Sequence, residues 1–105
     1  MFVKQSPKFQ YLLRLEKGED ILSSLQHFCS LYPQIGAGSI NGIGAVSQAN
    51  VGFYNGSEYL ENSFSENLEI LSLIGNIATN QIVHLHGIFG RADGSCIGGH
   101  ILPGH

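Results

Sequence analysis

The amino-acid sequence predicts one domain of the α+β class, in which a single main helix accompanies a bent, mostly antiparallel sheet. One stretch follows the helical period, the remainder alternates between apolar and polar residues, and 14 glycines interrupt these strand-like segments. The chain has 105 residues, of which 43% are hydrophobic and 12% charged. That composition is enough for one compact core, although at this size contacts between subunits would add stability.

The first expected strand covers Lys8–Leu15 and ends in the turn Glu16-Lys17-Gly18. A helix should follow, because apolar residues then recur with the helical period on one face. Glu19 and Asp20 lie in its first turn, where negative charge is favoured, and Pro33 ends it. The apolar face consists of Ile21, Leu22, Leu25, Phe28, Cys29 and Tyr32.

From Ile35 onward the sequence predicts strands punctuated by glycine, which permits bulges and close strand approach. A nucleotide-binding glycine loop is excluded, because Gly42 comes one place too late after Gly36 and Gly38 and no helix follows. Asn55-Gly56 is a typical hairpin turn. The expected strands are 36–46, 49–54, 58–64 and 68–78.

Charge and cysteine usage exclude several classes of protein. Five Lys and Arg residues stand against eight Asp and Glu, and the basic residues form no run, which argues against autonomous DNA binding. Cys29 and Cys96 are far apart and form no metal-type or redox motif, so we expect a reducing, cytoplasmic location. No apolar run is long enough to span a membrane, and the start at Met1 does not resemble a signal peptide.

The segment from Ile82 to Leu102 predicts a hairpin that carries three histidines. Strand alternation places His84 and His86 on one face, with α-carbons about 6.6 Å apart. If Ala92-Asp93-Gly94 form a three-residue loop, His100 faces His86 directly and His84 diagonally. A loop with an even number of residues would instead turn His100 to the opposite face.

Three imidazoles on one face suit zinc or a similar divalent ion, with one position left open for water or a ligand. The expected metal ligands are therefore His84, His86 and His100. The alternative, that these histidines are only structural, carries about the same weight on spacing alone.

Glu69 is the only charge in the most apolar run, Leu68–Ile74. Three alternatives explain a charge at this position: Glu69 lies at a strand end near solvent, it acts as an acid/base or hydrogen-bond partner near the metal, or it forms an ion pair at a subunit interface. Glu69 is therefore a candidate catalytic residue. We also expect the run 68–77 to contribute to subunit contacts, so that a charge at Leu71 or Leu73 disrupts assembly or folding.

The segments that carry a family resemblance are Gly18-Glu19-Asp20-Ile21, Phe28-Cys29, Gly38–Val46, Leu68–Ile77, His84-Leu85-His86, Asp93-Gly94 and Gly98-Gly99-His100-Ile101. Together they resemble the plants and prokaryotes conserved (PPC) domain over nearly the whole chain. The resemblance implies an α+β fold with a bent, mostly antiparallel sheet or sandwich and one main helix, assembled as a homotrimer. It also implies that His84, His86 and His100 occupy the family's histidine positions.

Two further expectations come from this resemblance. Prokaryotic members are labelled predicted DNA-binding proteins by analogy with plant members that carry an AT-hook, but this sequence lacks the required Arg-Gly-Arg-Pro core. Family members usually continue beyond Gly-Gly-His with another strand or two, whereas this chain stops at His105. We therefore expect residues 1–105 to form a single PPC-like domain that is incomplete at its C-terminus.

The leading hypothesis is a small cytoplasmic trimer with a divalent-metal site, acting through assembly or a small ligand. The alternative is a metal-dependent lyase or hydrolase, because the fold resembles that of acetolactate decarboxylase, a zinc enzyme with three histidines. A purely structural interaction module is a third possibility. An enzyme requires a concave pocket beside the open metal position, whereas a DNA-binding protein requires a basic face.

Overall fold

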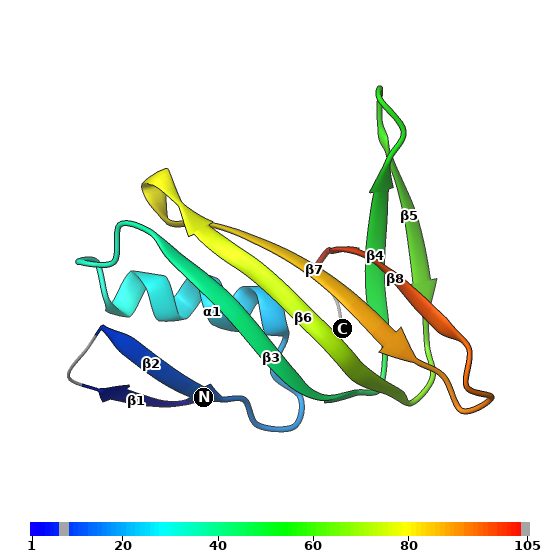
Figure 1. The fold of residues 1–105 in the computed structure, drawn as a ribbon, viewed down its shortest axis with the longest axis horizontal. Coiled ribbons are helices and arrows are strands. Elements are labelled where there is room, and N and C mark those ends of the chain that lie inside the picture. Colours follow the sequence, from blue (N-terminus) through cyan, green and yellow to red (C-terminus); the bar gives the residue numbers. More distant parts are fainter. Residues whose placement is uncertain (7–8, 104–105) are drawn as a thin grey trace.

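The computed structural model describes residues 1–6 and 9–103, which form one main helix and two antiparallel sheets (Figure 1). Strands β1 and β2 form a separate hairpin, and the other six follow the order β3-β6-β7-β8-β4-β5. The elements are β1 (Phe2–Ser6), β2 (Gln10–Arg14), α1 (Ile21–Leu31), β3 (Gly38–Val46), β4 (Ala49–Tyr54), β5 (Tyr59–Phe64), β6 (Leu68–Ala78), the 3₁₀ turn η1 (Thr79–Gln81), β7 (Ile82–Gly90) and β8 (Cys96–Ile101).

Helix α1 confirms the predicted helix and packs its apolar side against the sheet, but it begins at Ile21, so that Glu19 and Asp20 precede its first turn instead of lying in it. The Asp20 side chain caps it by accepting a 2.8 Å hydrogen bond from the Ser23 N–H. Ile21, Leu22, Phe28 and Cys29 are buried against the inner face of the sheet. Neither cysteine is disulfide-bonded, and burial raises the pKa of the Cys29 thiol. No helix among the described residues is long and apolar enough to cross a membrane.

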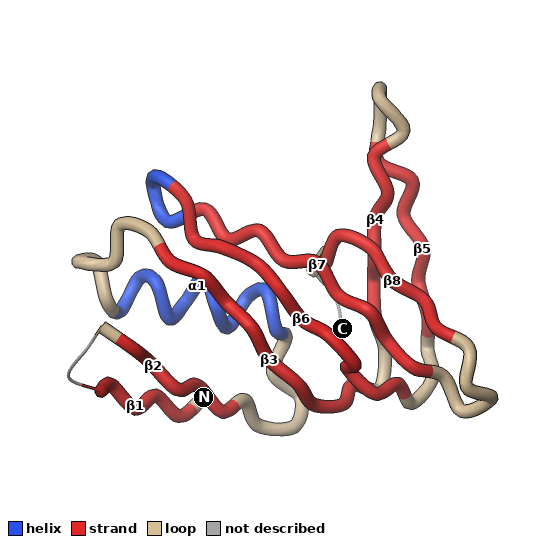
Figure 2. Tube along the Cα trace, viewed as in Figure 1, coloured by secondary structure: helices blue, strands red, loops and turns tan. Residues whose placement is uncertain are grey.

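The six-stranded sheet bends sharply, and the β4–β5 hairpin stands steeply away from β3, β6 and β7 (Figure 2). The hairpin joins the rest of the sheet through a short ladder, in which β4 and β8 pair at Val51 opposite Ile101 and at Gly52 opposite His100. Register shifts in the β3–β6 and β6–β7 ladders confirm the expected bulges. Leu73, with 8% of its surface exposed, belongs to the core, whereas Leu71 is 52% exposed.

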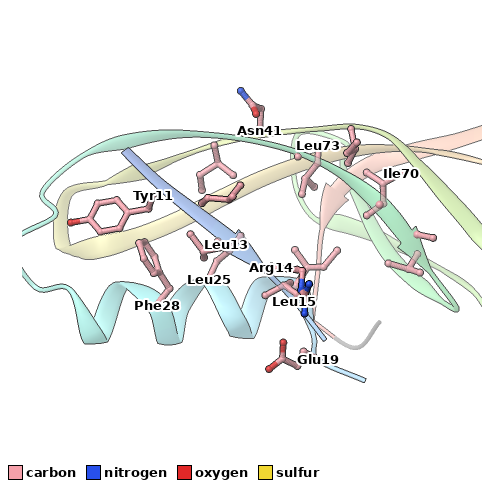
Figure 3. A pocket seen from close by; sticks show the side chains of 18 of the residues that line it. Tyr11, Leu13, Arg14, Leu15, Glu19, Leu25, Phe28, Asn41, Ile70 and Leu73 are labelled. Carbon is pink, nitrogen blue, oxygen red and sulfur yellow. The ribbon is translucent and has the colours of Figure 1, made fainter. Parts of the chain in front are cut away.

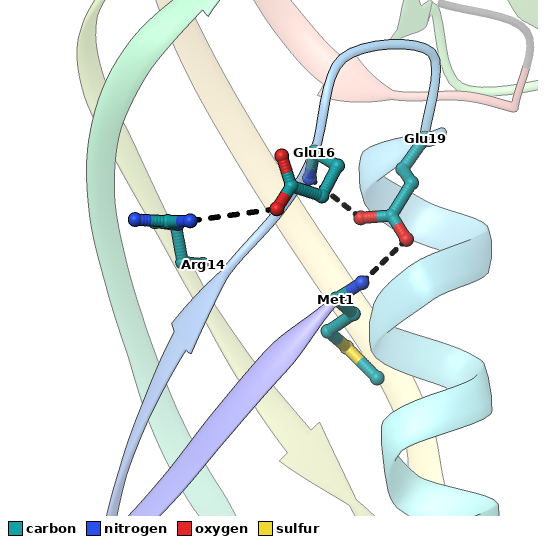
Figure 4. A network of polar contacts seen from close by, with 4 residues as sticks. All are labelled: Met1, Arg14, Glu16 and Glu19. Carbon is teal, nitrogen blue, oxygen red and sulfur yellow. Dashed lines mark hydrogen bonds and ion pairs between the residues drawn. The ribbon is translucent and has the colours of Figure 1, made fainter.

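The N-terminal segment differs from the sequence expectation. β1 was not predicted, because Lys4, Gln5 and Ser6 give it no clear apolar alternation. β2 lies within the expected strand, whose first residue, Lys8, is outside the described residues. At the open end of the hairpin, the Met1 ammonium donates to Glu19 Oε1 at 2.6 Å, which joins the hairpin to the segment just before α1 (Figure 4).

Candidate metal centre

The loop between β7 and β8 has the length that the sequence predicts. The Arg91 N–H donates to the Ser95 carbonyl at 2.8 Å, and the Gly94 N–H donates to the Arg91 carbonyl at 2.9 Å. Gly94 adopts a φ of +86°, the left-handed conformation expected for the third loop residue. Asp93 fixes the turn by accepting hydrogen bonds from the Ser95 N–H at 2.9 Å and hydroxyl at 2.6 Å.

This turn sets the register of the two strands, so that His86 lies directly opposite His100. Val83, Leu85 and Phe89 point into the core from β7, and His84 and His86 therefore lie on the outer face. The ring of His100 is 5.6 Å from that of His84 and 5.6 Å from that of His86, centroid to centroid. The structure thus brings the three predicted histidines together on the predicted face.

The spacing of these rings can be compared with what zinc requires. Two imidazoles that bind one tetrahedral ion through nitrogens at about 2.0–2.1 Å have centroids about 5.2 Å apart. Within the described residues, however, no three His, Cys, Asp or Glu side chains are already arranged around a common ion position. The donor set and the two ring spacings that involve His100 are compatible with a divalent metal, although the three side chains do not surround a common ion position as they stand.

The surroundings of His100 favour its neutral form, which is the form that binds metals. Partial burial lowers the pKa of His100, and the neighbouring His86 and His84 lower it further through charge repulsion. His84 and His86 are exposed, whereas His100 is partly covered.

A cavity of about 500 Å³ lies beside His86 and His100. Residues of β6, β7 and β8 line part of it, and one wall comes from the β4–β5 hairpin. The Tyr59 ring of this hairpin is 5.4 Å from the His100 ring and 5.3 Å from the Tyr54 ring, centroid to centroid. Sequence reasoning did not find these tyrosines. The only local signal was the pair of aromatic residues flanking the Asn55-Gly56 turn.

The structure does not bring Glu69 to the histidines. Glu69 is exposed near the start of β6, opposite Gly90, whereas Ile74 is the β6 residue opposite His86. Five residues of strand separate these positions, or about 16 Å. Of the three explanations for Glu69, its surroundings match a solvent-exposed strand end.

The fold and site together define a small α+β domain with a histidine cluster on the outer face of a bent antiparallel sheet. Residues 4–105 match the Plants and Prokaryotes Conserved (PCC) domain, the family abbreviated PPC above, and the chain belongs to this family.

Solved structures of three relatives share the fold. A protein of Bacteroides thetaiotaomicron, described as a candidate DNA-binding protein, is 34% identical with a TM-score of 0.89, and the match covers 97% of this chain and 73% of that one. A metal-containing protein of Archaeoglobus fulgidus is 36% identical with a TM-score of 0.78, and the match covers 87% of this chain and 67% of that one. A PPC protein of Pyrococcus horikoshii is 31% identical with a TM-score of 0.82, and the match covers 89% of this chain and 68% of that one.

A second kind of relative is much longer. The bifunctional protein GlmU of Synechococcus sp. strain JA-3-3Ab is 37% identical over 95 residues, which are 90% of this chain and 15% of that protein. GlmU of strain JA-2-3B'a(2-13) is 33% identical over 94 residues, 90% of this chain and 14% of that protein. The chain therefore spans only a small part of these curated relatives.

Proposed function

We propose that this protein is a small homotrimer that binds a divalent metal, zinc by preference, through His84, His86 and His100, and acts through assembly or a small ligand. The observation that carries the proposal is the pairing of His86 with His100, which gathers three imidazoles on one exposed sheet face. The Archaeoglobus relative, described as metal-containing, supports it.

The residues of the cluster have distinct parts in this proposal. Three neutral imidazoles hold the ion and leave one position open. When bound, the metal supplies Lewis acidity, which lowers the pKa of a water ligand and polarises a carbonyl oxygen. Tyr54 and Tyr59 form an aromatic wall beside the open side of the cluster and orient a ligand that enters the neighbouring cavity.

Assembly is supported by apolar side chains on the same outer face. Ile74 is 61% exposed, Ile82 53% and Ile88 49%, on neighbouring strands. Phe53 on the β4–β5 hairpin is 64% exposed. A patch of this kind is typical of a contact between subunits, and trimer formation would cover it.

A metal-dependent lyase or hydrolase is the second candidate, and the cavity beside the histidines favours it. Its volume of about 500 Å³ lies within the range of about 300–1,000 Å³ that is usual for small-molecule sites. An apolar lining with a few polar groups would accept a compact carbonyl or ester substrate.

DNA binding is the label carried by the Bacteroides relative, and the charges of this chain give it little support. Arg91 makes a bidentate ion pair with Glu66, and Arg14 contacts Glu16 at 3.4 Å. Two of the five basic side chains are therefore neutralised locally, and the formal charge is −3.

Metal analysis of protein purified without a His-tag, together with its mass in solution, tests the proposal. We expect about one zinc or similar ion per chain, because all three ligands come from the same chain, and the mass of a trimer. Metal-free protein that gains no ion on incubation with zinc would contradict the metal site. If that metal-free protein is nevertheless a trimer, the result would favour a purely structural interaction module. Turnover of small esters or 2-keto acids by the zinc-loaded protein, lost on chelation, would favour the enzyme.

A further inference from the structure

Tyr59, at the start of β5, lies against His100 of the histidine cluster. The two ring centroids are 5.4 Å apart and the ring planes are tilted by 34°, which is an offset stack rather than an edge-on contact. The rings of His84 and His86, in contrast, meet the His100 ring at 83° and 70°. His100 is thus in ring contact with Tyr59 as well as with both other histidines.

Packing, and not hydrogen bonding, orients the His100 ring. Histidines that bind metals usually donate their second ring N–H to a carboxylate or a carbonyl, and this hydrogen bond fixes the ring. Within residues 1–6 and 9–103, the His100 ring makes no hydrogen bond. Its orientation therefore depends on the groups packed around it, and Tyr59 is the one aromatic ring among them that is not itself an expected metal ligand.

The β4–β5 hairpin holds Tyr59 in this place. The Tyr54 ring lies 5.3 Å from the Tyr59 ring, and the Tyr54 hydroxyl donates a 3.0 Å hydrogen bond to the Gly56 carbonyl in the hairpin turn. Gly52, which pairs with His100, leaves the space that the Tyr59 ring occupies, because an added Cβ would lie 3.2 Å from Tyr59 Cδ1. The anchored neighbour and the missing side chain together place Tyr59 beside His100.

A stacked ring restricts an imidazole without competing for its metal-binding atoms. The lone pair of an imidazole nitrogen lies in the plane of the ring, whereas an offset-stacked neighbour covers part of the face. Rotation of the His100 ring away from its present orientation would break the contact with Tyr59. The stack therefore lowers the conformational freedom that His100 would lose on binding an ion.

We propose that Tyr59 is a positioning residue of the histidine cluster: its ring fixes the orientation of the His100 imidazole and so strengthens metal binding, without contacting the metal. This inference rests on the proposed metal site and adds to it a residue from a different hairpin. The aromatic ring carries the effect, because the contact between Tyr59 and the cluster is a ring contact. Phenylalanine should therefore replace Tyr59, and alanine should not.

The first experiment detects the stack in the metal-free protein. An aromatic ring over the His100 imidazole shifts its proton signals upfield, which two-dimensional ¹H–¹³C spectra of the full 105-residue chain measure. We expect this shift in the wild type and in Tyr59→Phe, and its loss in Tyr59→Ala. His27, exposed on α1, is the internal reference and should not move. Unchanged His100 signals in Tyr59→Ala would overturn the proposal.

The second experiment measures zinc affinity by isothermal titration. Tyr59→Ala should weaken zinc binding about threefold to tenfold, the size expected of one aromatic contact, whereas Tyr59→Phe should stay within about twofold of the wild type. The visible spectrum of the cobalt(II)-loaded protein, which reports ligand geometry, should change in Tyr59→Ala and be unchanged in Tyr59→Phe. Leu60→Ala, at the neighbouring 46% exposed position outside the cavity lining, is the matched control and should behave like the wild type.

A variant at Gly52 tests the placement of Tyr59 while keeping its ring. Gly52→Val adds a side chain where the Tyr59 ring and a Leu102 methyl group lie, so it should displace the ring and weaken zinc binding. Combined with Tyr59→Ala, the two losses should not add, because both remove the same contact. Circular dichroism shows whether Gly52→Val folds. If it does not, the Tyr59 variants decide the question.

The outcomes separate the role of Tyr59 from the metal site itself. If the wild type binds zinc tightly and Tyr59→Ala binds it equally tightly, the role of Tyr59 is refuted and the metal site stands. Equal losses in Tyr59→Ala and Tyr59→Phe would also refute it, since the hydroxyl would then carry the effect. A wild type that shows the upfield shift but takes up no zinc would contradict the metal site, and with it the contribution of Tyr59.

Discussion

His100 on β8 lies directly opposite His86 on β7, and the two rings are 5.6 Å apart, centroid to centroid. This relationship depends on a turn of three residues that contains no histidine. The positive φ of Gly94 sets the length of the turn, and the turn sets the face on which His100 lies. The geometry of the candidate metal site is thus specified mainly by residues outside it.

Replacing one histidine of the cluster should abolish tight metal binding. His86→Ala and His100→Ala each remove one of three ligands, and we expect zinc affinity to fall by more than the 10–100-fold typical of losing an outer hydrogen-bond partner. His27→Ala, an exposed histidine on α1, is the matched control and should leave affinity unchanged. Isothermal titration with zinc measures all three; equal affinity for H100A and H27A would remove His100 from the site.

The ionised Glu19 carboxylate should stabilise the fold, and this contribution should be lost in acid. The hydrogen bond from the Met1 ammonium, and then that from the Glu16 N–H, lower the pKa of Glu19 from its ordinary value of 4.5. A lowered carboxyl pKa gives stability that is present above pH 4.5 and lost as the pH falls through the folded value. The midpoint temperature of thermal unfolding, measured between pH 2 and 7, should therefore be higher for untagged wild type than for Glu19→Gln near neutrality. The two midpoints should converge in acid. A constant difference throughout would contradict this.

The sequence predicts the helix and the histidine hairpin well because both depend on local signals. The capping residue Asp20, the apolar period of the helix and the loop residue Gly94 act within a few positions of their effects. The chain also resembles its family strongly enough for the fold to be expected, and the family match confirms it.

The cavity beside His100 and the larger cleft between the β1–β2 hairpin and β3 (Figure 3) could not be predicted from such local signals. The aromatic wall beside His100 forms because the sheet bends and brings Tyr59 across from another hairpin, 41 residues away in sequence. The cleft beside β3 exists because the β1–β2 hairpin forms a separate sheet. Strand β1 could not be predicted, because its polar residues Lys4 to Ser6 show no apolar alternation. Both depend on the relative placement of sheets, which local patterns do not encode.

Gly75→Ala should destabilise the fold through a backbone clash. A Cβ at this position in β6 would run into the His84 carbonyl oxygen and lie 2.6 Å from a Leu85 methyl group. Because a backbone atom cannot turn away, we expect a loss near the upper end of the about 1–3 kcal/mol typical of overpacking. Gly36→Ala, where an added Cβ meets nothing within 4 Å, is the control. Urea unfolding of both variants measures the difference, and similar midpoints would contradict it.

The isolated protein should bind duplex DNA weakly. Its formal charge is −3, so three copies carry −9 and repel a polyanion at long range. We expect no saturable binding to random duplex at about 150 mM salt in an anisotropy titration. Tight binding that falls steeply as salt rises would overturn this expectation and would require a basic patch formed by assembly.

Ile74→Glu should dissociate the assembly without unfolding the subunit. Ile74 is 61% exposed in the single chain and lies beside the histidines on the outer face, so a charge there meets water in a monomer but an apolar partner in a trimer. Leu73→Glu, one residue earlier, places its charge in the core and should instead unfold the chain, because Leu73 is only 8% exposed. Ile43→Glu, at an 87% exposed position on β3, is the control that should remain assembled. Sedimentation equilibrium over a hundredfold range of concentration separates these outcomes: a well-folded wild-type monomer throughout would refute assembly, and a stable wild-type dimer would retain assembly but exclude the trimer.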